Sequence, residues 1–395
     1  MSRLGTESAF QVLSRARELE RQGKNIIHLE IGEPDFATPS NIVNAGVKAL
    51  NAGWTHYGPS AGYPELREAI AAEVSRTRKV QVSADEVVVV PGGKPIIFYS
   101  ILALVDEGDE VIYPNPGFPI YESMIRYVGG RAVPIRLLEN KDFAFDVDEF
   151  SSLITDRTRL IILNSPQNPT GGVLSKGDIE QIAAAIGDRD IFVLSDEIYS
   201  RLVFEGQHHS IMSVPGFQQR TILLDGFSKA YAMTGWRMGY GVMRRDLAPH
   251  VARLMTNSNS CTASFTQMAG VEALRGDQSS VNRMRDEFHA RAEMFVAGLN
   301  QIHGFSCRMP KGAFYAFPNI TGTGLKSKKL SEILLDDAGV ACLSGASFGE
   351  FGEGYLRFSV ANSMENLGKA LERIADWAEK NIRHTGHKIT GSKKA

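Results

Sequence analysis

The chain has 395 residues, of which 43% are hydrophobic and 22% are charged, and its formal net charge at pH 7 is -2. This composition is typical of a globular protein and excludes a chain too polar to bury a core. The small net charge gives no electrostatic basis for binding nucleic acid or a membrane surface. A chain of this length predicts about two or three domains.

The first residues and the cysteines bear on the cellular compartment. Residues 1–7 contain no apolar signal-peptide core, and no apolar run is long enough to span a bilayer. Cys261, Cys307 and Cys342 are too few and too scattered for a disulfide framework or a zinc site. We therefore expect a cytoplasmic, reducing compartment and no bound metal. The small and basic residues at 385–395 predict a disordered tail.

The N-terminal third of the chain predicts helices separated by loops. Apolar residues at helical spacing predict a helix over 7–22, and a short strand pattern follows at 28–31. A second helix is expected from about Ser40, and a third from Pro64, because proline is favoured at the first helical position. The glycines and proline of 54–62 indicate a loop between them.

Short apolar runs then alternate with helical patterns. The runs that predict strands lie at 87–90, 110–113, 160–163, 191–194, 221–224 and 238–242. Repeated strand–helix units indicate an α/β fold, with a mostly parallel sheet and helices on both faces. No Gly-x-Gly-x-x-Gly follows a strand, which weighs against a dinucleotide-binding domain.

A different pattern occupies the last third of the chain. A long helical segment at 277–299 leads to strand patterns at 312–317, 340–343 and 355–360, and a helix at 364–382 closes the chain. These elements predict a second, smaller α+β domain. We expect residues 41–285 to form the large domain, residues 286–384 to form the small one, and residues 1–40 to pack with the small domain.

Residues that suit a ligand site follow five of the predicted strands. They are Gly92, Gly93, Phe118, Asn168, Asp196 and Lys229. Each has an ordinary alternative, since glycines make turns, asparagine precedes prolines in turns, aspartate caps helices and phenylalanine packs in cores. Ligands of open α/β sheets lie beyond the carboxyl ends of the parallel strands. We therefore expect these residues to lie together at one edge of the sheet.

Lys229 lies just beyond the strand at 221–224, among small and aromatic residues. Burial in such surroundings disfavours the charged ammonium, and a neutral lysine amine can form a Schiff base with an aldehyde. Arg237, eight residues later, is suited to bind a phosphate through two hydrogen bonds. The turn at Gly92 and Gly93, before a helix, also favours phosphate binding, because free main-chain N–H groups point toward the anion.

Seven motifs together resemble those of class I, fold-type I aminotransferases, which depend on pyridoxal 5'-phosphate. The motifs are Gly32-Glu33-Pro34-Asp35-Phe36, Tyr57-Gly58-Pro59, Gly92-Gly93-Lys94, Asn164 to Gly171, Ser195-Asp196-Glu197-Ile198-Tyr199, Ser228 to Tyr240, and Leu356-Arg357-Phe358-Ser359. The resemblance extends from about residue 27 to about residue 378, and is strongest to the subgroup that includes many bacterial aspartate aminotransferases. It implies a seven-stranded, mostly parallel sheet.

The resemblance and the needs of the cofactor assign a role to each candidate residue. Lys229 would form the Schiff base and carry the proton, and Asp196 would keep the pyridine nitrogen protonated. The other cofactor-binding residues are Asn168 and Tyr199 at the ring hydroxyl, Phe118 stacked on the ring, and Tyr57, Gly92, Gly93, Lys94, Ser228 and Arg237 near the phosphate. The substrate would meet Gly32, Phe118, Asn168 and Arg357, whose guanidinium suits the α-carboxylate.

The resemblance also implies an assembly and a reaction. Tyr57 would reach the cofactor phosphate of a neighbouring subunit, so a homodimer with shared active sites is expected. The expected function is transamination between an L-amino acid and a 2-oxo acid, with aspartate or glutamate favoured. Phe118 stands where aspartate-specific members often carry tryptophan, so an aromatic or broad specificity stays open.

Two other functions stay open beside transamination. A related enzyme of the same cofactor, such as a C–S β-lyase or a cyclopropane-carboxylate synthase, would share the cofactor-binding residues. A transcription regulator with an aminotransferase-like domain would need a DNA-binding domain ahead of it. The short N-terminal segment leaves no room for one and carries no basic stripe.

Overall fold

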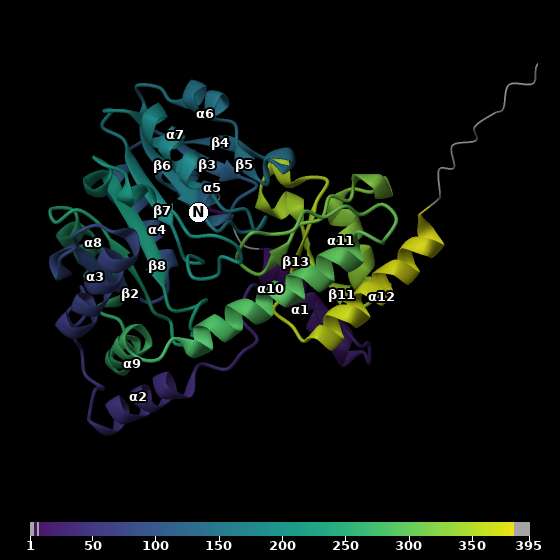
Figure 1. Cartoon of the computed structure of the whole chain (residues 1–395), viewed down its shortest axis with the longest axis horizontal. Helices are drawn as coiled ribbons and strands as arrows, with labels where there is room; N and C mark the ends of the chain where they lie inside the picture. The colour runs from purple at the N-terminus through teal and green to yellow at the C-terminus, as the bar shows by residue number, and fades with distance from the viewer. Residues whose placement is uncertain (1–3, 6–7, 383–395) are drawn as a thin grey trace, which may run out of the picture.

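The computed structural model describes residues 4–5 and 8–382, so the predicted tail at 385–395 lies outside the described residues. Two regions of the described chain form separate sheets (Figure 1). The larger sheet contains eight strands in the order β2-β9-β8-β7-β6-β3-β4-β5. Its strands are β2 (Val87–Val90), β3 (Glu110–Asn115), β4 (Arg131–Leu138), β5 (Ala144–Phe145), β6 (Thr158–Asn164), β7 (Phe192–Asp196), β8 (Thr221–Gly226) and β9 (Gly239–Val242).

The larger sheet is mostly parallel, as the sequence predicted. Strands β8, β7, β6, β3 and β4 are paired in parallel, and β2 runs the same way because both β2 and β8 pair antiparallel with β9. The eighth strand, β5, is a two-residue antiparallel pair at the edge, beyond the seven strands that were expected. All six parallel strands therefore end at one edge of the sheet.

Strand β4 is the member of the sheet that no sequence pattern indicated. Its residues include Pro134, and several of its side chains are only half-buried. The short β5 is its outer neighbour, so most of β4 lies near the edge of the sheet. Proline and partly polar sequences are tolerated at such positions, because fewer ladder hydrogen bonds are needed there.

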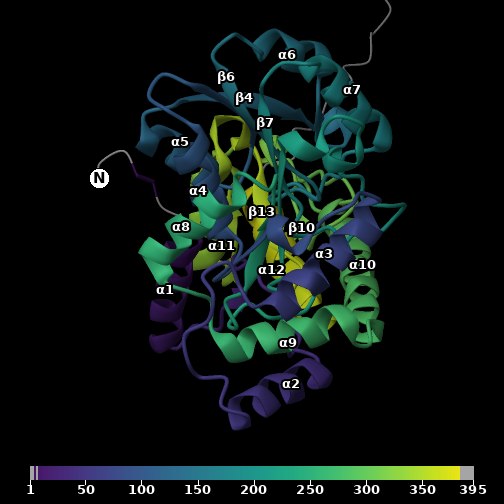
Figure 2. The ribbon, with the colours of Figure 1, turned by 90° about the vertical axis from the view of Figure 1, so that its left-hand side faces the viewer.

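Helices cover both faces of this sheet (Figures 1 and 2). They are α3 (Pro64–Arg78), α4 (Lys94–Leu104), α5 (Ile120–Val128), α6 (Val147–Leu153), α7 (Lys176–Ile186), α8 (Ala248–Asn259) and α9 (Ser264–Arg275), with α2 (Ser40–Asn51) packed on α9. The four valines of β2 explain the need for two covered faces. Val88 and Val90 join one apolar cluster, and Val87 and Val89 join another on the opposite face.

The smaller region lies at the far end of the long helix α10 (Ser279–Leu299), which links it to the large sheet in Figure 1. Its elements are α1 (Ser8–Arg21), β1 (Ile27–His28), β10 (Tyr315–Ala316), α11 (Ser327–Asp336), β11 (Val340–Ala341), β12 (Leu343–Ser344), β13 (Leu356–Ser359) and α12 (Met364–Asn381). Strand β13 lies between β10 and β12, and β1 pairs in parallel with β11. The predicted domain boundaries stay a prediction.

The single strand predicted at 340–343 is wrong. The chain breaks its regular pairing at Cys342, so that β11 pairs with β1 while β12 pairs with β13. The two halves therefore belong to different sheets. The strand predicted at 28–31 is likewise shorter, ending at His28.

Within the described ranges, none of the helices has both the length and the apolar character needed to cross a membrane. Cys261, Cys307 and Cys342 are free thiols. The cytoplasmic compartment stays a prediction.

Candidate active site

The predicted site residues converge at the edge where the parallel strands end. Gly92 and Gly93 follow β2, Phe118 follows β3, Asn168 follows β6, Asp196 ends β7 and Lys229 follows β8. The smaller region reaches the same place through β13. Its Arg357 donates a hydrogen bond from Nη1 to Oδ1 of Asn168 at 3.2 Å. The candidate site therefore lies where the two regions of the chain meet.

Lys229 presents its amine to an enclosed and partly aromatic space. Its Nζ donates to the carbonyl oxygen of Gly32 and lies 5.8 Å from the ring centroids of both Tyr199 and Phe314. Burial lowers the pKa of Lys229 to about 8, and the positive charge of Arg357 acts in the same direction. A useful fraction of this amine is neutral near pH 7, so Lys229 is a competent nucleophile.

Asp196 is a buried carboxylate with few hydrogen-bond partners. Its Oδ2 accepts from the Tyr121 hydroxyl at 2.6 Å, and its Oδ1 accepts from the main-chain N–H of Ile198 at 3.3 Å. Burial raises the pKa of Asp196 to about 6 despite these two bonds. A cationic ring nitrogen nearby would favour the ionised carboxylate. Asp196 is therefore suited to partner a protonated pyridine.

A glycine turn and an arginine form a cradle that suits a phosphate. Gly92 has φ +84°, and a Cβ on it would lie 2.3 Å from Nη2 of Arg237. A Cβ on Gly239 of β9 would lie 2.8 Å from the carbonyl carbon of Gly92. The turn leads into the N-terminus of α4, which no side chain of the described residues caps. Main-chain N–H groups there and Arg237 can therefore share one anion with the nearby Ser228.

Arg357 is held in the site by contacts from both regions. Its side chain is 4% exposed, and its Nη2 donates to the carbonyl oxygen of Glu30. Its guanidinium lies 4.7 Å from the ring centroid of Tyr315. All four residues of β13 are buried, so the predicted division into a buried and an outward face is wrong. The smaller region covers one face and the site itself lies at the other.

Two tyrosines of the site were not predicted. The hydroxyls of Tyr199 and Tyr315 share a hydrogen bond of 2.7 Å, and Tyr121 supports Asp196. Tyr121 lies three residues after Phe118, and their rings pack edge to face with centroids 5.9 Å apart. That spacing in a short helix was the available signal. Tyr315 gave none, because its strand pattern predicted only packing.

The remaining predicted residues differ in their exposure. The Nζ of Lys94, the first residue of α4, lies 5.4 Å from the ring centroid of Phe118. Lys94 and Phe118 therefore belong to the same wall of the site. The Tyr57 side chain is 88% exposed, so the structure does not bring it against the other predicted residues.

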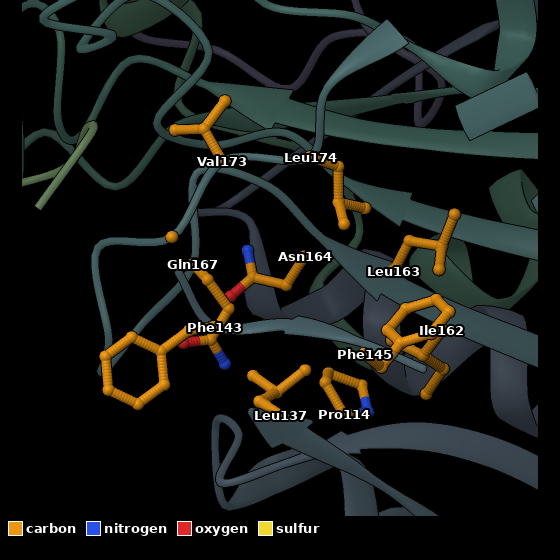
Figure 3. Close-up of a pocket in the computed structure, with 11 residues that line it drawn as sticks. Pro114, Leu137, Phe143, Phe145, Ile162, Leu163, Asn164, Gln167, Val173 and Leu174 are labelled. Carbon is orange, nitrogen blue, oxygen red and sulfur yellow. The ribbon is translucent and has the colours of Figure 1, made fainter. Parts of the chain in front are cut away.

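A small cavity lies behind the loop that carries Asn168 (Figure 3). Its volume is about 20 Å³, and it is lined mostly by apolar side chains, with the polar groups of Asn164 and Gln167 among them. This volume is about that of one water molecule. Its described lining includes none of the predicted site residues. We interpret the cavity as packing space behind the loop.

The chain is similar to known aminotransferases over most of its length. The family described as aminotransferase class I and II matches residues 24–374. An aspartate aminotransferase of Pyrococcus horikoshii is 41% identical over 366 residues, which are 91% of this chain and 93% of that protein. The aromatic-amino-acid aminotransferase 2 of Thermococcus litoralis is 38% identical, covering 89% of this chain and 91% of its own.

A solved structure gives the same result for the fold. The aspartate aminotransferase from Rhizobium meliloti superposes with a TM-score of 0.92 at 34% sequence identity, covering 97% of this chain and 99% of that chain. Both the mostly parallel sheet and the smaller region are included in this match. The chain therefore belongs to the class I and II aminotransferases, enzymes that use pyridoxal 5'-phosphate.

Proposed function

We propose that this aminotransferase takes the amino group of aspartate or glutamate and passes it to a 2-oxo acid, with 2-oxoglutarate as acceptor. The observation that carries the proposal is a pair of cations near Lys229. Arg357 and Lys94 both lie close enough to lower the pKa of that amine. A dicarboxylic substrate would bring one carboxylate to each cation. The aspartate aminotransferases among its relatives support the same choice.

Arg357 is the proposed partner of the substrate α-carboxylate. Its planar guanidinium can donate two parallel hydrogen bonds to a carboxylate, which a lysine cannot. Asn168 and the carbonyl of Glu30 already fix its orientation before any substrate binds. The arrangement therefore holds the amino group toward Lys229 with little reorganisation.

Pyridoxal 5'-phosphate, when bound, supplies an aldehyde and an aromatic ring that accepts electrons. Lys229 is proposed to bind the aldehyde through Nζ and, once displaced by the substrate amine, to remove the α-proton of the amino acid. Asp196 is proposed to hold the ring nitrogen protonated, with Phe118 against the ring face. Asn168 and Tyr199 would donate to the ring hydroxyl, and Tyr315 orients the Tyr199 hydroxyl.

Lys94→Ala tests the choice of substrate. We expect kcat/KM for aspartate to fall by about 1–3 kcal/mol in transition-state stabilisation, because the distal carboxylate loses its charged partner. The values for phenylalanine and alanine should change little. A cation at the N-terminus of α4 is disfavoured by the helix dipole, so the protein should not be destabilised by its removal. Steady-state kinetics with the three donors is the measurement.

Lys94→Arg is the matched control, since it keeps the charge and should keep most of the activity on aspartate. An equal loss for all donors of Lys94→Ala would instead place Lys94 on the cofactor phosphate. A preference for phenylalanine in the unaltered enzyme would favour the second candidate, an aromatic aminotransferase. The aromatic rings of Phe118, Phe314 and Tyr315 and the Thermococcus litoralis relative are its support.

We also propose that the enzyme is a homodimer with shared sites. Val43, Val47 and Leu50 form an exposed apolar stripe along α2, with exposed fractions of 36%, 50% and 44%. Such a stripe is typical of a surface covered by a partner. The loop that carries Tyr57 is anchored by Ser264, whose hydroxyl donates to the carbonyl oxygen of His56 at 3.0 Å. The exposed Tyr57 ring therefore projects from a fixed loop.

Mixing of two inactive variants tests the shared site. In a heterodimer of Tyr57→Ala and Lys229→Ala subunits, one site would combine the intact Tyr57 and the intact Lys229. Equal mixtures should regain about a quarter of the wild-type activity, because half of the dimers are mixed and each has one intact site of two. Activity after subunit exchange is the measurement.

The control mixture is Asp196→Ala with Lys229→Ala. Both changes lie in the site of a single chain, so no mixed dimer gains an intact site. Recovery in this control, or none in the first mixture after verified exchange, would contradict the shared site.

A further inference from the structure

We propose that Arg78 is a positioning residue for catalysis, which fixes the distance between Asp196 and Lys229 by bridging Glu197 and Asp225. The proposal does not depend on which amino acid is the substrate. It rests on a buried polar network behind the candidate site, on the side of α3, whose last residue is Arg78.

The bridge lies where the main-chain pairing between β7 and β8 stops. The parallel register of these strands ends at Asp196 opposite Leu224. The main-chain N–H of Glu197 then donates to the carbonyl oxygen of Leu224 at 2.8 Å. Beyond that point Asp225 turns to β9, where it pairs with Tyr240. The segments that carry Asp196 and Lys229 therefore separate here.

The guanidinium of Arg78 connects the next residue of each strand. Its Nε donates to Oε2 of Glu197 at 2.9 Å, and its Nη2 donates to Oδ2 of Asp225 at 3.1 Å. Its Nη1 donates to the hydroxyl of Thr77 at 2.8 Å, which fixes the plane of the fork. The three side chains in the bridge are at most 10% exposed. Arg78 thus replaces the main-chain tie that the diverging strands have lost.

Both carboxylates are held by further donors. Those to Glu197 are Ser195, Ser210 and His208, and those to Asp225 are Ser200 and the main-chain N–H of Gly226. Burial opposes ionisation of Glu197, but Arg78 and His208 together hold its pKa at about 2. The carboxylate of Glu197 is therefore charged and has little freedom to rotate.

Stability alone is a poor explanation for this network. Desolvation of buried charges offsets most of their attraction, and apolar residues in such places are often equally stable. Position is the better explanation, because Asp196 directly precedes Glu197 and Lys229 follows Asp225 by four residues. A displacement of about 1 Å between catalytic groups can reduce a rate about a hundredfold.

Two substitutions that conserve charge test the proposal in the holoenzyme. Arg78→Lys keeps one positive charge but cannot reach both carboxylates through a planar fork. Glu197→Asp keeps the negative charge but withdraws it by one methylene. For each, we expect kcat to fall about 10- to 100-fold while KM changes much less. Arg76→Lys is the matched control, since Arg76 lies on the same helix, 68% exposed, and pairs with Glu73.

A second readout does not depend on turnover. The visible absorbance of the cofactor linked to Lys229 titrates with pH, and its midpoint reports the charges and distances around that link. We expect the midpoint to shift by about half a pH unit or more in both variants, and to be unchanged in Arg76→Lys.

The proposal is overturned by folded variants whose midpoint and kcat match those of Arg76→Lys within about twofold, even if their melting temperatures are lower. That outcome would make the network a purely structural ion pair. If Arg78→Lys does not fold, Glu197→Asp decides by the same two measurements. A wild-type protein without the visible absorbance would instead contradict the cofactor assignment, which keeps the two failures distinct.

Discussion

Replacement of Lys229 by alanine is expected to lower kcat by about four orders of magnitude or more, because one amine serves as both nucleophile and proton carrier. The variant should still bind the cofactor without a covalent link. Asp196 and the cradle of Gly92 and Arg237 do not depend on the lysine side chain. Steady-state kinetics and equilibrium dialysis of the cofactor measure the two effects.

Borohydride reduction followed by mass spectrometry of the digested protein identifies the linked residue. In the wild type the added mass should lie on the peptide that contains Lys229, and in Lys229→Ala it should be absent. Lys94→Ala is the matched control, since it removes a nearby lysine and should keep the added mass on Lys229. Cofactor mass on any other lysine would contradict the assignment.

The pKa of Lys229 gives this prediction a pH dependence. The neutral amine is the nucleophile, and burial lowers the pKa to about 8 in the cofactor-free protein. The rate at which added cofactor becomes linked should therefore rise with pH up to about 8 and level off above it. An ordinary exposed lysine would continue to gain reactivity to about pH 10.

The local pattern of the sequence was enough for the sheet and for its ligand-binding edge. The four valines of β2 have no polar partner positions, so only a strand covered on both faces accommodates them. Asp196 and Lys229 follow such runs directly, and parallel strands place their ends together. The approximate location of the site thus followed from residues that are neighbours along the chain.

What the sequence did not reveal depends on contacts between distant residues. Tyr121 reaches Asp196 across 75 positions, and Tyr315 meets Tyr199 across 116. The break at Cys342 is set by two different partner strands, which no local pattern records. Arg78 has the composition of any charged helix end, and its role emerges only when the ends of β7 and β8 are placed beside it.

Asp196→Asn is expected to lower kcat by at least about a hundredfold, of the order seen when one preorganised polar group is lost from a buried site. Asparagine keeps the size of the side chain and can still accept from the Tyr121 hydroxyl. It removes the negative charge that would keep the ring nitrogen protonated. The link to Lys229 should persist, so the variant should still show the absorbance of the bound cofactor. Near-normal turnover would show that another residue partners the ring.

The affinity of the cofactor-free protein for the cofactor supplies a second test of Asp196. Burial raises the pKa of this carboxyl to about 6, so its charge is present above that pH and lost below it. Wild-type affinity should therefore fall as the pH drops through about 6, and the Asn variant should lack that component. The cofactor phosphate also titrates near pH 6, but it does so with both proteins and cancels in the comparison. Identical pH profiles for the two proteins would show that Asp196 does not contact the ring nitrogen.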